Sequence, residues 1–247
     1  MAKFWEPFNT GRIFVPFSLE HNLALIMILL FVITCFKFKA FYKKNDLVVR
    51  RYIAIAMFLQ QILLYLWYLT SGSFSLKESL PLYTCRIAII ISIFMLINPK
   101  QWMVDMVYFW GFVGAFIALL SPDTSTFAFP HFMFVQYFFG HGLLIFVSIY
   151  MIRIKEYTID IKSFIRILKV TIFYTVSIMS INNFLGSNYA YLNGKPSAAT
   201  VLDILPPYPY YIPIMITITL VLFFVSLMPF YIKKITSLGC IFVKKRV

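Results

Sequence analysis

Long apolar runs, separated by short loops rich in lysine and arginine, constrain this chain more than any other feature of its sequence. A helix needs about 20 apolar residues to cross the ~30 Å hydrocarbon core of a bilayer, which is close to the length of these runs. The chain is 61% hydrophobic and 13% charged, whereas a soluble domain is roughly 25% charged. We therefore predict an all-α, polytopic membrane protein in which residues 1–247 form one domain. It is a bundle of seven transmembrane helices, at residues 21–36, 47–69, 80–97, 102–120, 132–152, 170–185 and 211–232.

The positive charge follows the sides of the membrane. The formal net charge is +13, and most of the 22 Lys and Arg fall in loops on alternate sides of consecutive spans. These basic positions are within residues 37–51, at Lys100, and within residues 153–169 and 233–246. Because positively charged loops stay in the cytoplasm, we expect the N-terminus outside, the C-terminus in the cytoplasm, and the cell membrane as the location. The charge therefore needs no nucleic-acid partner to explain it.

Several polar side chains lie at a similar depth in the outer halves of the predicted spans. Counted from the cytoplasmic edges at ~1.5 Å per residue, Cys85, His141 and Asn182 all lie roughly 20 Å up. On the same count His21 lies roughly 24 Å up, and His131 lies at the outer surface. A single membrane histidine or asparagine more often makes an interhelical hydrogen bond, and a lone cysteine is usually a small apolar residue. The shared depth favours a common site.

The residue types at this depth can carry nucleophilic acyl chemistry. A cysteine becomes a nucleophile when an imidazole takes its proton, and an amide side chain can orient the imidazole or stabilise an oxyanion. Tyr137 shares a helix face with His141, so its hydroxyl could bond the ring, and Gln136 precedes it. Arg86 either adds positive potential beside Cys85 or extends outward to the interface.

The cysteine pattern indicates no metal or cofactor chemistry. Cys35, Cys85 and Cys240 are too few and too scattered for a disulfide framework or a zinc site, so we expect neither a metal nor a cofactor. Two threonines near the outer face, Thr70 and Thr84, remain open as alternative nucleophiles.

Four stretches of the chain resemble a known family. They are FSLEHNLAL at residues 17–25, LPLYTC at 80–85, FPHFMFVQYFFGHG at 129–142 and NYAYLNGKPSAATVLDILPPYPYY at 188–211. In order and spacing these stretches resemble the YwaF family of bacterial integral membrane proteins. That family is similar to the eukaryotic transmembrane protein 164 acyltransferase family. The resemblance runs through nearly the whole chain.

This resemblance implies a cysteine- and histidine-dependent transfer of acyl groups between lipids. By position, Cys85 matches the family's cysteine and His141 the histidine of its Gly-His-Gly motif. The chain departs from the pattern at Tyr83, where a histidine is common, and at Tyr208 and Tyr210, where tryptophans are usual. If the missing histidine were the base, the protein would be a weaker enzyme or none. Further matching positions are His21, His131, Asn188, Lys195, Pro196 and Asp203.

We predict a membrane-embedded lipid acyltransferase or lipid hydrolase with a Cys–His site facing the outer leaflet. Cys85 is the expected nucleophile and His141 the expected base, with His131 and His21 as further catalytic candidates. Membrane lipid is the expected partner. The residues expected to bind it are Arg86, Asn182, Asn183, Asn188, Lys195, Asp203, Gln136 and Tyr137.

The alternative is a non-enzymatic carrier, sensor or immunity-type protein that binds an extracellular ligand in the outer half of the bundle. Polar residues inside a bundle mark transport paths as readily as active sites. The confinement of polarity to the outer half, and the absence of two similar sequence halves, argue against a carrier. A structural partner of another membrane protein also remains open, as does the oligomeric state. The resemblance places the enzyme first.

Overall fold

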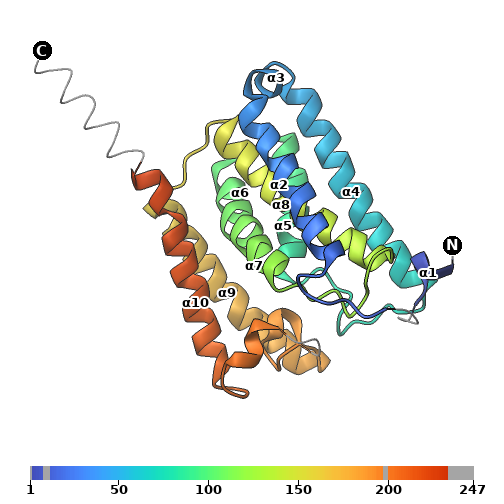
Figure 1. Cartoon of the computed structure of the whole chain (residues 1–247). Coiled ribbons are helices and arrows are strands. Elements are labelled where there is room, and N and C mark those ends of the chain that lie inside the picture. Colours follow the sequence, from blue (N-terminus) through green and yellow to red (C-terminus); the bar gives the residue numbers. More distant parts are fainter. Residues whose placement is uncertain (1, 8–11, 197–199, 233–247) are drawn as a thin grey trace, which may run out of the picture.

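The computed structural model describes residues 2–7, 12–196 and 200–232 (Figure 1). In these residues the regular structure is helical, apart from one isolated bridge between Ile13 and Phe127, so the predicted all-α fold is confirmed. The α-helices are α1 (Ala2–Trp5), α2 (Leu19–Lys37), α3 (Lys39–Lys44), α4 (Asp46–Thr70), α5 (Thr84–Ile97), α6 (Gln101–Met106), α7 (Gly114–Leu120), α8 (Phe132–Arg153), α9 (Ile161–Leu185) and α10 (Tyr211–Ser226). A π-helix, η1 (Val107–Val113), and two short 3₁₀ helices, η2 (Tyr189–Tyr191) and η3 (Val201–Ile204), complete the set.

Six of the predicted spans are long and apolar enough to cross a membrane, which makes this a multi-pass membrane protein. They are Leu19–Lys37, Asp46–Thr70, Gln101–Leu120, Phe132–Arg153, Ile161–Leu185 and Tyr211–Ile232. The predicted span at residues 80–97 is shorter, because α5 has 14 residues and begins at Thr84. Its length is about 21 Å, against the ~30 Å of a hydrocarbon core. Pro81 disfavours helix at the residue before it, and residues 80–83 form a turn instead. The prediction of seven spans is therefore confirmed for six.

Helix α8 lies at the centre of the bundle. It contacts α2, α4, α5, η1 and α7, and 67% of its most apolar stretch is buried, compared with 11% for α9. Helices α9 and α10 run side by side along one flank of this bundle (Figure 1). Close packing of α8 against α2 depends on Gly142, where an added Cβ would lie 2.9 Å from Cγ1 of Ile28. The site described below lies where the α9–α10 flank meets α8 and its neighbours.

The span at Gln101–Leu120 changes from α-helix to π-helix in its middle. The wider turn alters the backbone pairing, and Ser148 on α8 donates to the backbone oxygen of Val107 at 3.1 Å. The indole of Trp110 donates to Thr171 on α9 at 2.9 Å. Tyr108 donates to the backbone oxygen of Ser226 at 2.8 Å. Such π segments are frequent at functional sites, and this one attaches the α9–α10 flank to the bundle.

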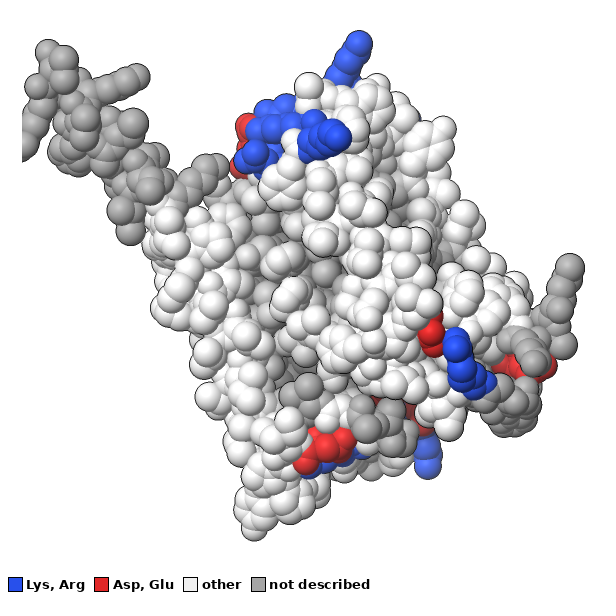
Figure 2. All heavy atoms as spheres, in the orientation of Figure 1, with Lys and Arg blue, Asp and Glu red and all other residues white. Residues whose placement is uncertain are grey.

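The two ends of the bundle differ in charge (Figure 2). On the face shown, Lys and Arg form a cluster beside a small acidic patch at the end that carries α3, whereas the opposite end carries scattered residues of both signs. At the basic end, Asp46 accepts from Arg50 at 3.1 Å and from Lys155 at 2.9 Å. The basic tail with Cys240 lies outside the described residues. The predicted orientation, with the basic end in the cytoplasm, remains a prediction.

Helix α9 begins earlier than predicted. The predicted start at residue 170 is wrong, because the charged residues Lys162, Arg166 and Lys169 belong to the helix. Asp160 caps it by accepting from the backbone N–H of Ser163 at 2.9 Å. Basic side chains at the end of a span can reach the interface along their aliphatic stems, so they need not end the helix.

Candidate active site

A cavity of about 630 Å³ lies between the central helices and the α9–α10 flank. Its walls come from α4, α5, η1, α7, α8, α9 and α10. The loop between α9 and α10, which we call the outer loop after its predicted side of the membrane, also lines it. The volume is typical of small-molecule sites, which span roughly 300–1,000 Å³. The predicted site residues that line it are Cys85, Arg86, Gln136, Tyr137 and His141.

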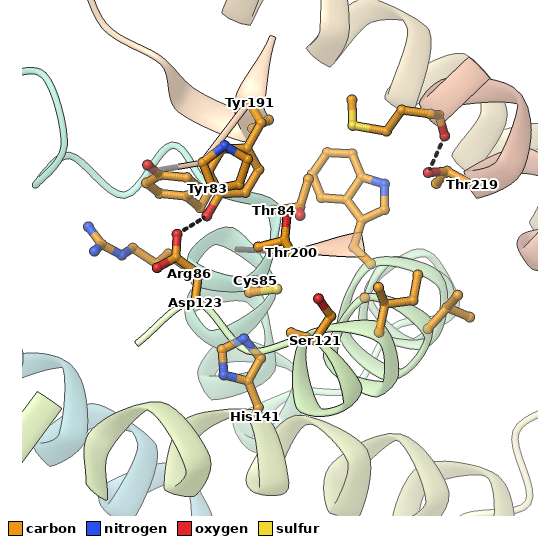
Figure 3. A pocket seen from close by; sticks show the side chains of 18 of the residues that line it. Tyr83, Thr84, Cys85, Arg86, Ser121, Asp123, His141, Tyr191, Thr200 and Thr219 are labelled. Carbon is orange, nitrogen blue, oxygen red and sulfur yellow. Dashed lines mark hydrogen bonds between the residues drawn. The ribbon is translucent and has the colours of Figure 1, made fainter. Parts of the chain in front are cut away.

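Cys85 and His141 reach this cavity from different helices (Figure 3). Cys85 lies in the first turn of α5, on the same helix face as Ile89 one turn below. Helix α8 passes close to that face, since an added Cβ at Gly140 would lie 3.5 Å from Cδ1 of Ile89. Across from α5, an added Cβ at Gly114 would lie 3.8 Å from Sγ of Cys85. Tight packing of α5 and α8 thus brings the thiol and the imidazole into one cavity.

The imidazole of His141 is held by its own helix. Nδ1 lies 2.8 Å from the backbone oxygen of Tyr137, and the two rings lie 4.2 Å apart between centroids. A carbonyl oxygen only accepts, so Nδ1 carries the proton, and in the neutral ring Nε2 keeps its lone pair. The predicted bond from the Tyr137 hydroxyl to the ring is wrong, because that hydroxyl donates to the backbone oxygen of Ala118 at 2.9 Å.

Arg86 lines the cavity, but the protein itself binds its guanidinium. Nη1 lies 3.0–3.3 Å from the three backbone oxygens of residues 78–80, and Nη2 donates to the Tyr68 hydroxyl at 2.5 Å. The rings of Tyr68 and Tyr83 flank it at 5.5 and 5.4 Å. Arg86 therefore stabilises the turn that precedes α5. A lipid phosphate that bound Arg86 would share guanidinium N–H groups that already donate to the protein.

The predicted residues of the long outer loop shape that loop without lining the cavity. Lys195 donates to the backbone oxygen of Leu205 at 2.6 Å, and Asp203 accepts from the backbone N–H of Thr200 at 2.7 Å. Asn188 donates to a backbone oxygen further along the loop at 2.8 Å. These contacts fold the loop so that other residues in it, Ala190, Tyr191, Leu192, Pro196, Thr200, Leu202 and Leu205, line the cavity.

Asn182 and Asn183, near the end of α9, are not among the cavity-lining residues. Asn182 is fully buried, where it donates to the backbone oxygen of Tyr189 and accepts from its N–H, both at 2.9 Å. Asn183 is exposed. Counting helical rise placed Asn182 at the depth of Cys85, but depth does not determine the direction in which a side chain points.

His21 and His131 also lie outside the cavity lining, and the backbone engages both nitrogens of each ring. His21 is fully buried and contacts backbone groups at 2.8 Å on both sides, which joins the start of α2 to the end of α7. His131 caps α8 by accepting from the N–H of Met133 at 3.1 Å, and its other nitrogen lies 3.0 Å from the backbone oxygen of Glu6. Of the three histidines, the structure therefore brings His141 to the cavity.

Two glutamines that the sequence analysis did not single out line the cavity from α4. Gln60 donates to Oε1 of Gln136 at 2.5 Å, and Gln61 donates to Oε1 of Gln60 at 2.6 Å. Gly140 makes room for this chain of amides, because an added Cβ there would lie 3.0 Å from Nε2 of Gln60. Adjacent glutamines inside an apolar run are themselves a signal of an intramembrane polar contact.

A second contact that the sequence did not predict joins two residues of the cavity lining. Tyr191 of the outer loop donates to Oδ2 of Asp123, which follows α7, at 2.9 Å (Figure 3). Burial, together with the neighbouring carboxylate, raises the pKa of Tyr191, so the hydroxyl remains a donor. Asp123 and Tyr191 lie far apart in the sequence, so only the folded chain brings them together.

The structure also bears on the two threonines that were predicted as alternative nucleophiles, and on metal binding. Thr84 lines the cavity, whereas Thr70 accepts from the indole of Trp5 at 2.9 Å and is not part of the lining. Among the residues that the structure describes, no three His, Cys, Asp or Glu side chains gather closely enough to hold a metal ion. Cysteine is thus the strongest nucleophile in the lining.

One known family pattern contains the three parts of the chain that build this cavity: the cysteine, the Gly-His-Gly segment and the outer loop. The model of the TMEM164 family matches residues 16–227, which include all three. This chain belongs to the TMEM164 family. The match confirms the resemblance found in the sequence. No curated protein and no solved structure matches the chain.

In this member of the TMEM164 family, Tyr83 is one of the residues that line the cavity. Its ring lies 5.3 Å from that of Tyr189 and borders the cavity beside Arg86. Where the family resemblance led us to expect a histidine, this chain has a phenol. His141 is therefore the one histidine among the described residues of the lining.

Proposed function

We propose that this TMEM164-family protein is a membrane-embedded lipid acyltransferase or lipid hydrolase that works in the outer leaflet. Cys85 is the nucleophile and His141 the general base. The observation that supports this most is that a thiol and an imidazole line the same cavity, with Nδ1 of the imidazole 2.8 Å from a backbone oxygen, which leaves the lone pair of the neutral ring on Nε2. A base needs that free lone pair to take the thiol proton.

In the first half-reaction, Nε2 of His141 takes the thiol proton, and Sγ of Cys85 attacks the carbonyl carbon of a lipid ester. A C–S bond forms, and the carbonyl π electrons move to oxygen. When the tetrahedral intermediate collapses, the ester C–O bond breaks and the leaving alkoxide takes the proton from His141. The products are an acyl thioester on Cys85 and a free alcohol.

In the second half-reaction, His141 takes a proton from the hydroxyl of the acyl acceptor, whose oxygen attacks the thioester. The C–S bond breaks, and the thiolate of Cys85 recovers the proton from His141. If a lipid hydroxyl attacks, the protein is an acyltransferase; if water attacks, it is a hydrolase. The same two residues serve both outcomes.

The glutamine chain supplies a candidate for stabilising the tetrahedral oxyanion. Oε1 of Gln136 already accepts from Gln60, so the contact directs the carbonyl of Gln136 toward α4 and leaves its NH₂ group to donate. Gln136 lines the cavity on the same helix as His141. An amide N–H that is fixed before the reaction contributes more than one that must reorient.

The test is ester cleavage by the purified full-length protein. We expect turnover of a p-nitrophenyl acyl ester to fall by roughly 100-fold or more in Cys85→Ala and in His141→Ala. Cys35→Ala is the matched control, because Cys35 is fully buried on α2 and is not part of the cavity lining. Equal turnover in all four proteins would overturn the proposal. Lipid binding without turnover in the wild type would favour the non-enzymatic alternative.

A further inference from the structure

One part of the cavity is an apolar arm between η1 and the α9–α10 flank. We use the name apolar arm for the part lined by Phe109, Trp110, Val113, Thr171, Thr219 and Phe223. The glutamine chain lines the same cavity from α4 and α8. Cys85 lines it from α5, against which both α4 and η1 pack.

The polar side chains of the apolar arm are satisfied within the protein. Thr171 accepts from the indole of Trp110 at 2.9 Å, and Thr219 donates to the backbone oxygen of Met215 at 2.9 Å. Tyr174, beside them, donates to the backbone oxygen of Leu82 at 2.6 Å. The arm therefore presents mainly hydrocarbon to a guest, because these hydroxyl and indole groups already have partners.

Two phenylalanines close the apolar arm toward the basic end of the bundle. Phe109 is fully buried and Phe223 is 3% exposed, and their ring centroids lie 5.2 Å apart at an interplanar angle of 51°. Phe109 lies on the same span as Gly114, which faces Cys85, but five residues nearer the basic end of the bundle. We call Phe109 and Phe223 the floor of the arm.

The apolar arm also reaches the apolar surface of the bundle. Ile117 of α7 and Ile218 of α10 both line the cavity, yet they are 40% and 46% exposed. From these two side chains, which border both the cavity and the surface, we infer the position of an opening. An opening between α7 and α10 at this depth faces hydrocarbon, from which an acyl chain can enter without crossing water.

We propose that the apolar arm holds the acyl chain of the lipid, and that the floor sets the longest chain that fits. The chain enters between α7 and α10 and lies along Trp110, with its methyl end against Phe223. The reacting carbonyl then lies beside Cys85. The role of this arm in acyl selection rests on the proposed function, but the binding of a chain in it does not.

The floor predicts a specific dependence on chain length. Each additional methylene that the arm can bury raises affinity by about fourfold, from the transfer free energy of a CH₂ group. This gain must stop at the length at which the methyl end meets the floor. Longer chains have to fold back or leave carbons in the opening, so their affinity stays level or falls.

The experiment measures binding and turnover separately over a series of saturated chains from octanoate to eicosanoate. Binding is measured by displacement of a fluorescent fatty acid from full-length Cys85→Ala protein, in which no acyl-enzyme can form. Turnover is measured with the p-nitrophenyl esters of the same acids on protein that retains Cys85. Both series are repeated with Phe223→Ala, which removes half of the floor, and with Thr219→Phe, which fills the arm one turn above it.

The matched control is Phe224→Ala. Phe224 neighbours Phe223 on α10 but is 52% exposed and is not among the lining residues. We expect the best-bound chain to lengthen in Phe223→Ala, to shorten in Thr219→Phe, and to stay unchanged in Phe224→Ala. If Phe223→Ala fails to fold, a shorter best-bound chain in Thr219→Phe still tests whether the apolar arm holds the acyl chain.

The outcomes separate the two proposals. Length shifts in binding without turnover in any protein would support the apolar arm and overturn the acyl-transfer chemistry. Turnover that depends on Cys85, with one length profile in all folded variants, would support the chemistry and overturn the apolar arm. Binding that rises with length alike in every variant would reflect partition into detergent or bilayer and would also overturn the arm.

Discussion

Nδ1 of His141 donates to the backbone oxygen of Tyr137, one helical turn away, at 2.8 Å. The ring thus takes its tautomer and its orientation from the backbone of α8, without a carboxylate partner. Gln136 precedes Tyr137 on the same helix, so α8 supplies both the base and a candidate oxyanion donor. Because His141 contacts the backbone oxygen of Tyr137, a substitution of the Tyr137 side chain leaves this hydrogen bond in place.

Tyr137→Phe should therefore retain turnover within about tenfold, whereas His141→Gln should lose roughly 10²–10⁴-fold, the usual contribution of a general base. The phenylalanine keeps both the backbone oxygen and the ring contact with His141, and loses only the hydroxyl bond to Ala118. Ester cleavage by the two purified proteins checks this. A loss in Tyr137→Phe as large as that in His141→Gln would contradict the assigned role of the backbone.

The glutamine chain predicts unequal effects for two neighbouring substitutions. Gln61→Met removes a buried Oε1 that has no hydrogen-bond partner among the described residues, but it also removes the donor to Oε1 of Gln60, so the two effects offset and stability should change little. Gln60→Met should lower stability by about 1–3 kcal/mol, because it leaves groups of Gln61 and Gln136 unpaired. Thermal unfolding of both variants in the same detergent measures this. Equal destabilisation by the two changes would show that the amides do not form a directed chain.

Gly142→Ala should destabilise the protein by about 1–3 kcal/mol, the usual cost of overpacking. The new Cβ would lie 2.9 Å from Cγ1 of Ile28, so α2 and α8 would have to separate. Adding Ile28→Ala should recover part of the loss, because it removes the obstructing atom. Gly114→Ala is the control for unfolding temperature, since its new Cβ would lie at an ordinary 3.8 Å from Cys85. Independent, additive losses from the two changes at residues 28 and 142 would argue against this contact.

Asp160 predicts a pH dependence of stability at the start of α9. The hydrogen bond from the backbone N–H of Ser163 lowers the pKa of the Asp160 carboxyl in the folded protein. Its stabilisation is therefore full above the unfolded pKa of about 3.9, and is lost as the pH falls through the lower folded value. Asp160→Ala should cost about 1 kcal/mol at neutral pH, whereas Asp160→Asn keeps the cap without this titration.

Unfolding temperatures measured between about pH 6 and pH 3 check this prediction. The difference between the wild type and Asp160→Asn should change over the acidic part of that range and stay constant above it. A difference that does not vary with pH would mean that the Asp160 carboxyl is not perturbed by folding.

Much of the fold follows from apolar length alone. The bounds of the spans that became α2, α4 and α8 are within a few residues of the prediction, because only helix satisfies the backbone in lipid. Two boundaries fail for physical reasons. The turn at residues 80–83 shortens α5, and the basic residues that were predicted as a loop form the first turns of α9, where Arg166 pairs with the fully buried Asp105 of α6.

The candidate site was harder to predict from the sequence than the fold. Depth grouped Cys85 and His141, which line one cavity, with Asn182, which does not line it, because rise per residue carries no information about which face a residue occupies. Gln60 offered a compositional signal within an apolar run. The pairing of Asp123 with the outer loop depended on tertiary structure and offered none.

The proposed mechanism requires that Cys85 is the nucleophile. The most direct measurement is mass spectrometry of the Cys85 peptide after the purified protein is incubated with a lipid ester in the absence of an added acceptor. We predict an acyl mass on Cys85 that hydroxylamine removes, as expected of a thioester, and none on Cys35 or in His141→Ala. An unmodified Cys85 in protein that turns over the ester, or the same adduct at Cys35, would contradict the proposed mechanism.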